Sequence, residues 1–291
     1  MIGYMIELVT CRFAGRLDWL KSLSTVDKFT VYDKSFIRPY VGLYGYDYEN
    51  DPGSFESSEE LVEAYNEELR ENKITDFLQI KNWEDDKIIS LPNYGCEDHA
   101  FLYHIVHNYD RLADLTIFSQ DQYIDQSPDL INQINELDEN SKGFIPFQKK
   151  VLVGGEDMVS KHPKELGHYE DHKLDLKGFW NIYLKKELGE MPKSIIHFPN
   201  PFFAIDRDTI LKHPLSFYAD LKQSMDIQHH QLVESQITVD KWSEAQKTDT
   251  RVDWYNWCSS EPHMMVRVWN YIFGYEIPTD WYNTKVLEWY K

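Results

Sequence analysis

The sequence predicts an α/β fold in which a mostly parallel sheet is flanked by helices. Two apolar stretches near the N-terminus, "IELVTCRF" and "KFTVYDKS", are typical of buried strands. A short amphipathic segment at residues 17–23 lies between them, and two strands joined through a helix indicate a βαβ unit. The chain has 291 residues, of which 42% are hydrophobic, so it is long enough to bury the core of one large domain.

The first residues of the chain predict a strand and not a signal peptide. The stretch "MIGYMIELVTCRF" lacks a basic start and carries Glu7 within its apolar part. After the second strand comes a loop rich in glycine and tyrosine. A helix is then expected at residues 57–73, where Ser57 and Glu60 have the spacing of a capping box.

The stretch "LPNYGCEDHAFLYHIVHNYD" predicts a turn followed by a helix. Pro92, Asn93 and Gly95 favour the turn, and the helix is expected to begin near Glu97. One helix face is apolar, and His99 begins a second stripe that repeats every four residues. The helix leads into an apolar strand at residues 115–118. We therefore expect the start of the helix and the end of that strand to border one cleft.

The second half of the chain has weaker patterns. Residues 130–137 and the stretch "SFYADLKQSM" are helical in pattern, and "EPHMMVRVWNYIFGY" predicts a final amphipathic helix. Between them, "KSIIHFPNPFFAIDRDTILKHP" contains two short apolar runs about a Pro-Asn-Pro turn. Residues 141–193 alternate glycine, proline, lysine and aromatic residues, and this pattern predicts no element.

Charge and cysteine content narrow the classes of function. The formal net charge is −19, and residues 47–86 alone hold 14 Asp and Glu against three Lys and Arg, which is typical of a solvated helix face. An acidic chain argues against non-specific nucleic-acid binding, although the Lys-rich residues 142–193 can meet an anionic ligand. Three cysteines far apart in the sequence indicate neither a disulfide framework nor a zinc site, so a cytoplasmic location is expected. No run approaches the roughly 18 apolar residues of a membrane helix.

Polar side chains follow the strand in the stretch "DLTIFSQDQYIDQSPD". Gln120, Asp121 and Asp125 come after its carboxyl end, where open α/β sheets bind ligands. The two carboxylates are candidate ligands for a divalent cation, because hard cations prefer oxygen, and an ordinary polar loop is the alternative. This strand end has no Asp-x-Asp pair and no EF-hand loop. His104 and His107 could span one ion, but exposed histidines on a polar helix face explain them better.

Two further positions suggest chemistry. Arg12 directly follows the first strand and could clamp a phosphate, with a surface ion pair as the competing explanation. Cys96 precedes the expected helix start, where its pKa could be lowered, but a structural thiol is the better interpretation. The glycine pairs in "VGGED" and "GLYG" lack the spacing of a P-loop or a dinucleotide fingerprint and are more typical of turns.

Several stretches share motifs with one protein family. "VTCRF" and "LDWL" match its first strand and the segment after it at Arg12, Asp18 and Trp19, and "VYDKS" is similar to its second strand. The most specific block, "LPNYGCEDHAFL", keeps four family positions: Asn93, Gly95, Glu97 and His99. These stretches resemble a glycosyltransferase-like family of unknown function from microbes and viruses.

The chain also departs from this pattern. Cys96 stands where the family has an arginine, and Asp121 and Gln126 differ within a block that otherwise matches at Gln120, Asp125 and residues 127–129. The closing block "PHMMVRVWNYIFG" keeps three family residues, His263, Arg267 and Trp269, but has Val266 in place of a glutamate. The similarity leaves residues 40–90 and 140–195 uncovered.

The resemblance implies a GT-A-type glycosyltransferase. Its fold would be a single domain, residues 1–291, with a central, mostly parallel mixed sheet flanked by helices. Residues 1–125 would form a nucleotide-binding half and residues 126–291 an acceptor half. The enzyme would transfer a sugar from a UDP-, GDP- or CDP-linked donor to a hydroxyl acceptor: a glycan, a viral capsid component or a hydroxymethylated base of viral DNA. Either Asp121 and Asp125 would hold Mn²⁺ or Mg²⁺, or the enzyme would work without a cation.

The resemblance also implies roles for individual residues. The donor would be bound by the residues at the strand ends and the turn: Arg12, Asp33, Lys34, Asn93 and Gln120. The acceptor hydroxyl would be deprotonated by a carboxylate or histidine, and the candidates are Glu97, His99, Asp125, Glu261 and His263. A catalytically inactive relative that binds a glycan or a partner is the main alternative, and a hydrolase with paired carboxylates is a third.

Overall fold

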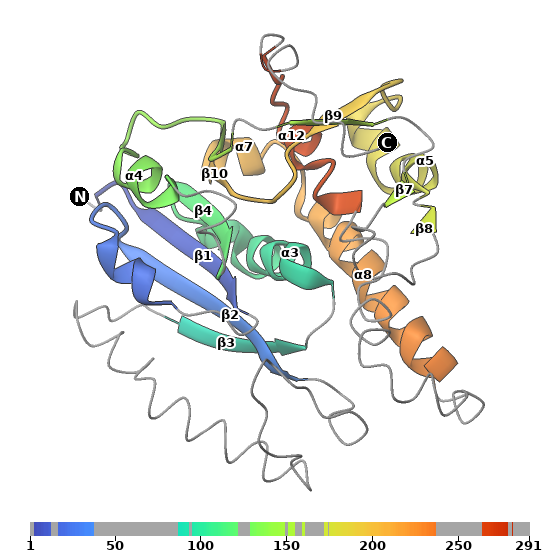
Figure 1. Cartoon of the computed structure of the whole chain (residues 1–291), viewed down its shortest axis with the longest axis horizontal. Coiled ribbons are helices and arrows are strands. Elements are labelled where there is room, and N and C mark those ends of the chain that lie inside the picture. The colour runs from blue at the N-terminus through green and yellow to red at the C-terminus, as the bar shows by residue number, and fades with distance from the viewer. Residues whose placement is uncertain are drawn as a thin grey trace, which may run out of the picture.

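A six-stranded mixed sheet forms the centre of the computed structural model, with the strand order β3-β2-β1-β4-β10-β5 (Figure 1). The structure describes residues 3–12, 17–37, 87–92, 95–121, 129–148, 151–154, 159–160, 172–173, 175–236, 264–278 and 281. The strands of the sheet are β1 (Ile6–Arg12), β2 (Lys28–Ile37), β3 (Lys87–Pro92), β4 (Leu115–Gln120), β5 (Phe144–Pro146) and β10 (Phe203–Asp206). The pairs β1–β2, β1–β4 and β2–β3 are parallel, whereas β10 runs antiparallel to β4 and β5. The predicted α/β fold with a mostly parallel sheet is therefore confirmed.

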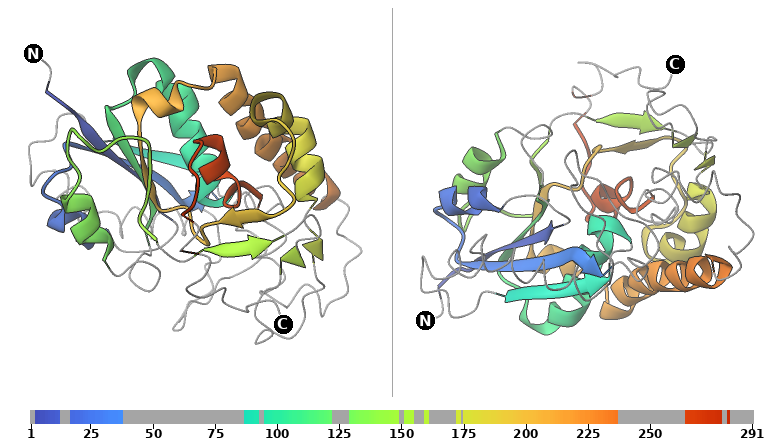
Figure 2. Two further views of the ribbon diagram at one scale, coloured as in Figure 1. Left: turned by 90° about the horizontal axis from the view of Figure 1, so that it is seen from above. Right: turned by 60° about the horizontal axis from the view of Figure 1, so that its bottom comes forward.

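Helices cover both faces of this sheet (Figure 2). On one face lies α3 (Cys96–Asn108), against which α8 (Leu215–Gln236) packs, and on the other lie η1 (Asp18–Ser22) and α4 (Leu130–Asn135). Every residue of β1 is buried, as expected for a strand that is covered on both faces. The remaining elements are η2 (Tyr109–Arg111), β6 (Leu152–Gly154), β7 (Val159–Ser160), β8 (His172–Lys173), α5 (Leu176–Phe179), the π-helical η4 (Trp180–Leu184), α6 (Lys185–Leu188), β9 (Ile195–His197), α7 (Arg207–Ile210) and α12 (Trp269–Ile272).

Aromatic side chains from both halves of the chain join the sheet to its helices. The Phe118 ring lies 4.8 Å from that of Phe101 on α3 and 5.3 Å from that of Phe203 on β10, measured between centroids. Phe203 in turn lies 5.6 Å from the Trp269 ring on α12. Because β5 and β10 belong to the second half of the chain, the two halves share one sheet, and each of the two hydrophobic clusters contains residues from both halves. None of the described helices combines the length and the apolar character needed to cross a membrane.

Most predicted elements are confirmed, with two differences. The segment at residues 17–23 forms a 3₁₀-helix and not an α-helix, and the predicted final helix is broken by a turn at residues 266–268 before α12 begins. Val266 and Val268 have low helix propensity, and Val268 leaves the helical backbone region with φ −121° and ψ −6°. The helix predicted at residues 57–73 lies outside the described residues.

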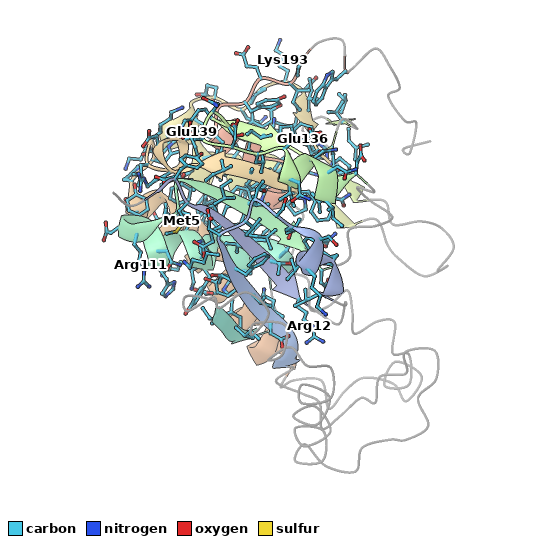
Figure 3. The ribbon with its side chains drawn as sticks, turned by 90° about the vertical axis from the view of Figure 1, so that its left-hand side faces the viewer. Met5, Arg12, Arg111, Glu136, Glu139 and Lys193 are labelled. Atoms are coloured by element: carbon cyan, nitrogen blue, oxygen red, sulfur yellow. The ribbon has the colours of Figure 1, made fainter. Side chains whose placement is uncertain are left out.

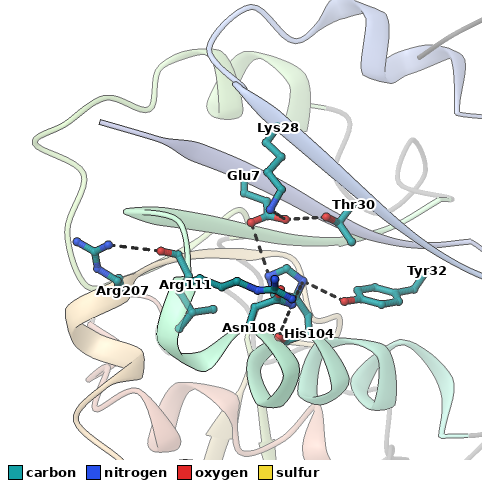
Figure 4. Close-up of polar contacts among 9 residues, drawn as sticks. Glu7, Lys28, Thr30, Tyr32, His104, Asn108, Arg111 and Arg207 are labelled. Atoms are coloured by element: carbon teal, nitrogen blue, oxygen red, sulfur yellow. Dashed lines mark hydrogen bonds and ion pairs between the residues drawn. The ribbon is translucent and has the colours of Figure 1, made fainter. Parts of the chain in front are cut away.

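A buried polar network lies between β1, β2 and α3 (Figure 4). The Glu7 carboxylate accepts hydrogen bonds from Thr30 Oγ1 at 2.6 Å and Lys28 Nζ at 2.9 Å, and His104 Nε2 lies 3.8 Å from it. His104 Nδ1 lies 3.1 Å from the Tyr32 hydroxyl. His104 is 1% exposed, so the expectation of an exposed, polar-face histidine is wrong, and burial lowers its pKa to about 4. The network neutralises a carboxylate that the sequence places inside a buried strand.

We expect Thr30→Val to lower the free energy of unfolding by about 1.5–3 kcal/mol, because the substitution removes one hydrogen bond to a buried charge. Thr116→Val is the matched control. Thr116 pairs with Glu7 across β1 and β4, yet its buried hydroxyl has no hydrogen-bond partner among the described residues. Its loss should leave the stability unchanged or raise it by up to about 1 kcal/mol. Urea unfolding measures both, and equal losses would contradict this account of Glu7.

Candidate functional site

The carboxyl ends of β1, β2 and β4 meet at one edge of the sheet. From β1 the chain proceeds outward to β2 and β3, and it then returns to β4 on the other side of β1. The boundary between β1 and β4 is therefore a topological switch point, the place where open α/β sheets bind ligands beyond the strand ends. Arg12, Asp33 and Gln120 lie at this edge, as the sequence predicts.

Arg12 and Asp33 form a buried ion pair at this edge. They are register partners on β1 and β2, and Arg12 Nη1 donates to Asp33 Oδ2 at 3.3 Å. Arg12 is 7% exposed and Asp33 is 1% exposed, so the pair is not the surface ion pair considered as an alternative. Figure 3 shows Arg12 at the end of β1, far from Met5 and Arg111 at the other edge of the sheet. A guanidinium has five N–H donors, so it can hold a carboxylate and a second anion together.

Asp121 directly follows β4 and is buried. Its backbone N–H donates to the Cys11 carbonyl at 3.1 Å, which extends the pairing of β1 and β4 by one residue. The other predicted metal ligand, Asp125, lies outside the described residues. Those residues contain no group of three or more His, Cys, Asp or Glu side chains that could hold a metal ion, and the metal site predicted at Asp121 and Asp125 stays a prediction. An Asp-x-Asp pair does occur at Asp206 and Asp208, but Asp206 pairs with Leu115 at the opposite edge, because β10 is antiparallel to β4.

The first turn of α3 is anchored to β2 by Lys34. The Lys34 ammonium donates to the carbonyl of Cys96, the first residue of the helix. Lys34 is fully buried, and burial lowers its pKa to about 8, although the Cys11 thiol and the Glu97 and Asp98 carboxyls oppose this shift. The Lys34 side chain therefore links β2 to α3, and its predicted role in donor binding stays a prediction.

Two further hydrogen bonds anchor this turn to elements far along the chain. Trp269 Nε1 donates to Asp98 Oδ1 at 2.5 Å, and His99 Nε2 lies 3.2 Å from Asp226 Oδ1 on α8. Burial raises the pKa of Asp98, with Glu97 adding to the shift, while burial lowers the pKa of His99 to about 3. His99 is 1% exposed, and its predicted catalytic role stays a prediction.

Gly95 and Cys96 set the entry to the helix. Gly95 has a φ of +65°, and a Cβ at this position would lie 2.6 Å from the His99 Cβ and 3.2 Å from the Met225 sulfur. Cys96 also has a positive φ, 48°. Cys96 is disulfide-bonded, which corrects the expectation of a structural thiol and of a chain without disulfides.

Glu97 differs from its neighbours in this turn. Its side chain is half-buried and makes no hydrogen bond or ion pair to a side chain among the described residues. Burial raises the pKa of the Glu97 carboxyl. A hydrogen bond from its own backbone N–H and the Lys34 ammonium oppose the shift, and the Asp121 carboxylate adds to it. A carboxyl with a raised pKa and no side-chain partner among the described residues is suited to accept or deliver a proton.

The structure thus brings together five predicted site residues and leaves others undescribed. Arg12, Asp33, Gln120 and Asp121 lie at the strand ends, and Glu97 is coupled to Asp121 electrostatically. The predicted residues Asn93, Asp125, Glu261 and His263 lie outside the described residues. No sequence pattern predicts the contact of Asp226 with His99, because the two residues are 127 positions apart and Asp226 carries no local motif.

We expect Gly95→Ala to destabilise the protein more than Gly143→Ala does. Gly143 has a similar φ of +73°, but no atom lies within 4 Å of the point where an alanine Cβ would stand, so alanine there incurs only the left-handed backbone cost of about 1–2 kcal/mol. At Gly95 the overlap with His99 should add about 1–3 kcal/mol. Equal unfolding midpoints for the two variants would show that His99 does not pack against Gly95 as described.

A protein family matches most of the chain. A search of the curated proteins finds no similar protein. A family described as a protein of unknown function, DUF3431, matches residues 65–278, a span that includes α3, β4, β10 and α8. The match covers well over half of the 291 residues, and the chain therefore belongs to the DUF3431 family.

Proposed function

We propose that this protein is a nucleotide-sugar-dependent glycosyltransferase. The observation that carries the proposal is the half-buried Glu97 carboxyl, which stands on an anchored helix turn beside the switch point of a parallel sheet. Transfer needs a nucleotide site and a proton acceptor within reach of each other. The switch point supports the first requirement, and the raised pKa of Glu97 supports the second.

The donor would bind beyond the ends of β1, β2 and β4. Its diphosphate carries negative charge that must be neutralised as the bond to the sugar breaks. Arg12 is the best-placed cation, because it lies at this edge and its fork-shaped guanidinium suits phosphate oxygens. A UDP-, GDP- or CDP-linked sugar is the proposed donor class. Of the two predicted ligands for Mn²⁺ or Mg²⁺, Asp121 and Asp125, the structure describes only Asp121, so no step is assigned to a cation.

Glu97 would act on the acceptor. As the acceptor oxygen bonds to the anomeric carbon, its proton moves to the Glu97 carboxylate and the nucleoside diphosphate leaves. The anchors through Cys96, Asp98 and His99 would hold this carboxylate in place before substrate binds, which is the preorganisation that positioned catalytic groups require. The acceptor classes proposed are a glycan, a viral capsid component or a hydroxymethylated base of viral DNA.

One observation favours the alternative of an inactive relative that binds a glycan or a partner. Lys34 is held by the Cys96 carbonyl, and Arg12 already neutralises Asp33, so both cations at this edge have protein partners. Such a relative would bind nucleotide or glycan without turnover. Release of nucleoside diphosphate from a panel of sugar nucleotides separates the two functions.

We expect at least one of the common nucleoside diphosphates to bind, as measured by calorimetric titration with and without manganese. Arg12→Lys should weaken that binding by about tenfold, because an ammonium keeps the charge beside Asp33 but cannot span two anions. Arg111→Lys, at the opposite edge, is the control and should bind within about twofold of the wild type. If no nucleoside diphosphate binds, the donor site is ruled out.

We expect Glu97→Gln to lower kcat/KM for sugar transfer by a factor of about 100 to 10,000, the range for loss of a positioned acid or base. The free energy of unfolding should change by no more than about 1 kcal/mol, which is the effect of a carboxylate in a helix's first turn. Glu136→Gln removes an exposed carboxylate at the end of α4 and serves as the control. Turnover close to that of the wild type in Glu97→Gln would reject Glu97 as the base.

A further inference from the structure

Two side chains of α8, Lys222 and Asp226, form a connected pair of contacts that reaches His99 in the first turn of α3. Asp226 Oδ1 lies 3.2 Å from His99 Nε2, and Asp226 Oδ2 accepts from Lys222 Nζ at 2.7 Å. The Asp226 side chain is 27% exposed, whereas that of His99 is 1% exposed. One carboxylate therefore contacts a buried imidazole on one side and a partly exposed ammonium on the other.

The bond to Asp226 defines both the protonation and the orientation of the imidazole. A carboxylate can only accept, so the proton of the neutral ring is assigned to Nε2 and the lone pair to Nδ1. The ring cannot turn without losing this bond, because it is enclosed on all sides. Burial keeps the imidazole neutral by lowering its pKa to about 3.

His99 transmits this constraint to the start of the helix. Its backbone N–H donates to the Gly95 carbonyl at 2.9 Å, and its Cβ lies where a side chain on Gly95 would stand. Glu97 lies between these two residues in the same turn. A shift of His99 would therefore move the backbone that carries the Glu97 carboxyl, while Arg12 and the strand ends would stay in place.

We infer that Asp226 is a positioning residue, which holds His99 and thereby sets the direction in which Glu97 presents its carboxyl to the substrate. The inference rests on the proposed function, in which Glu97 receives the acceptor proton. Asp226 does not touch the donor or the reacting atoms in this scheme. Its loss should therefore change turnover and leave donor binding alone.

Three substitutions on α8 separate positioning from general packing. Asp226→Ala removes the acceptor for His99 Nε2, whereas Asp226→Asn keeps a carbonyl oxygen that can accept the same bond. Lys222→Met is the matched control, because it removes the ion pair with Asp226 and leaves the bond to His99. A purely electrostatic role would make Asp226→Asn and Asp226→Ala behave alike.

The experiment measures nucleoside diphosphate release from UDP-glucose and GDP-mannose, nucleoside diphosphate affinity, and amide hydrogen exchange. Asp226→Ala should lower kcat at least tenfold, with nucleoside diphosphate affinity within threefold of the wild type. Asp226→Asn should recover most of the loss, and Lys222→Met should stay within threefold of the wild type. Amides of residues 95–101 should exchange at least tenfold faster in Asp226→Ala, while those of β1 stay unchanged.

The possible results separate a failure of the role inferred for Asp226 from a failure of the proposed glycosyltransferase function. Equal behaviour of Asp226→Ala and Lys222→Met in turnover, or unchanged exchange at residues 95–101, would overturn the role of Asp226. A wild type that releases no nucleoside diphosphate would refute the donors tested and overturn a catalytic role for Asp226. Faster exchange in Asp226→Ala would then still support its hold on the turn.

Discussion

The attachment of α3's first turn to three separate elements is the constraint on which the site depends. Lys34 holds the Cys96 carbonyl from β2, Trp269 holds Asp98 from α12, and Asp226 holds His99 from α8. Each bond involves a buried or partly buried charged or polar group, whose loss would leave a partner unsatisfied inside the protein. The turn is therefore fixed by contacts from both halves of the chain, β2 in the first and α8 and α12 in the second. Glu97 is the member of this turn that these bonds leave available.

The buried carboxyl groups at the two ends of the sheet differ in how many side-chain partners they have. At the amino end, the Glu7 carboxylate is neutralised by Lys28 and Thr30, and His104 is held near it by Tyr32. Such a network is closed within the protein and stabilises the join between β1, β2 and α3. At the carboxyl end, the half-buried Glu97 carboxyl has no such set of side-chain partners among the described residues. A closed network is typical of structure, whereas an incompletely satisfied polar group at a switch point is typical of a binding or catalytic site.

Local patterns were sufficient to predict the parallel part of the fold. The apolar runs of β1, β2 and β4 and the turn at Gly95 are short-range signals, and each is confirmed. The environments of the helix histidines depend on long-range contacts. The spacing of His104 and His107 predicted a polar, exposed helix face, but only His107 is exposed, because Glu7 lies beside His104. His99, a predicted catalytic residue, contacts Asp226 on α8. Asp226 is 127 positions from His99, so no local sequence pattern predicts their contact, and only the structure shows it.

The position of β10 between β4 and β5 has a consequence for synthesis of the chain. β4 is complete at Gln120, but the strand that covers its outer edge begins only at Phe203. At about 5–20 residues per second, translation needs several seconds to deliver β10 after β4 has left the ribosome. During that interval β4 presents an unpaired backbone edge, and β5 lacks its neighbour in the sheet. An unpaired apolar edge is a template for aggregation, so this protein should depend on chaperone protection of the nascent chain until β10 pairs with β4.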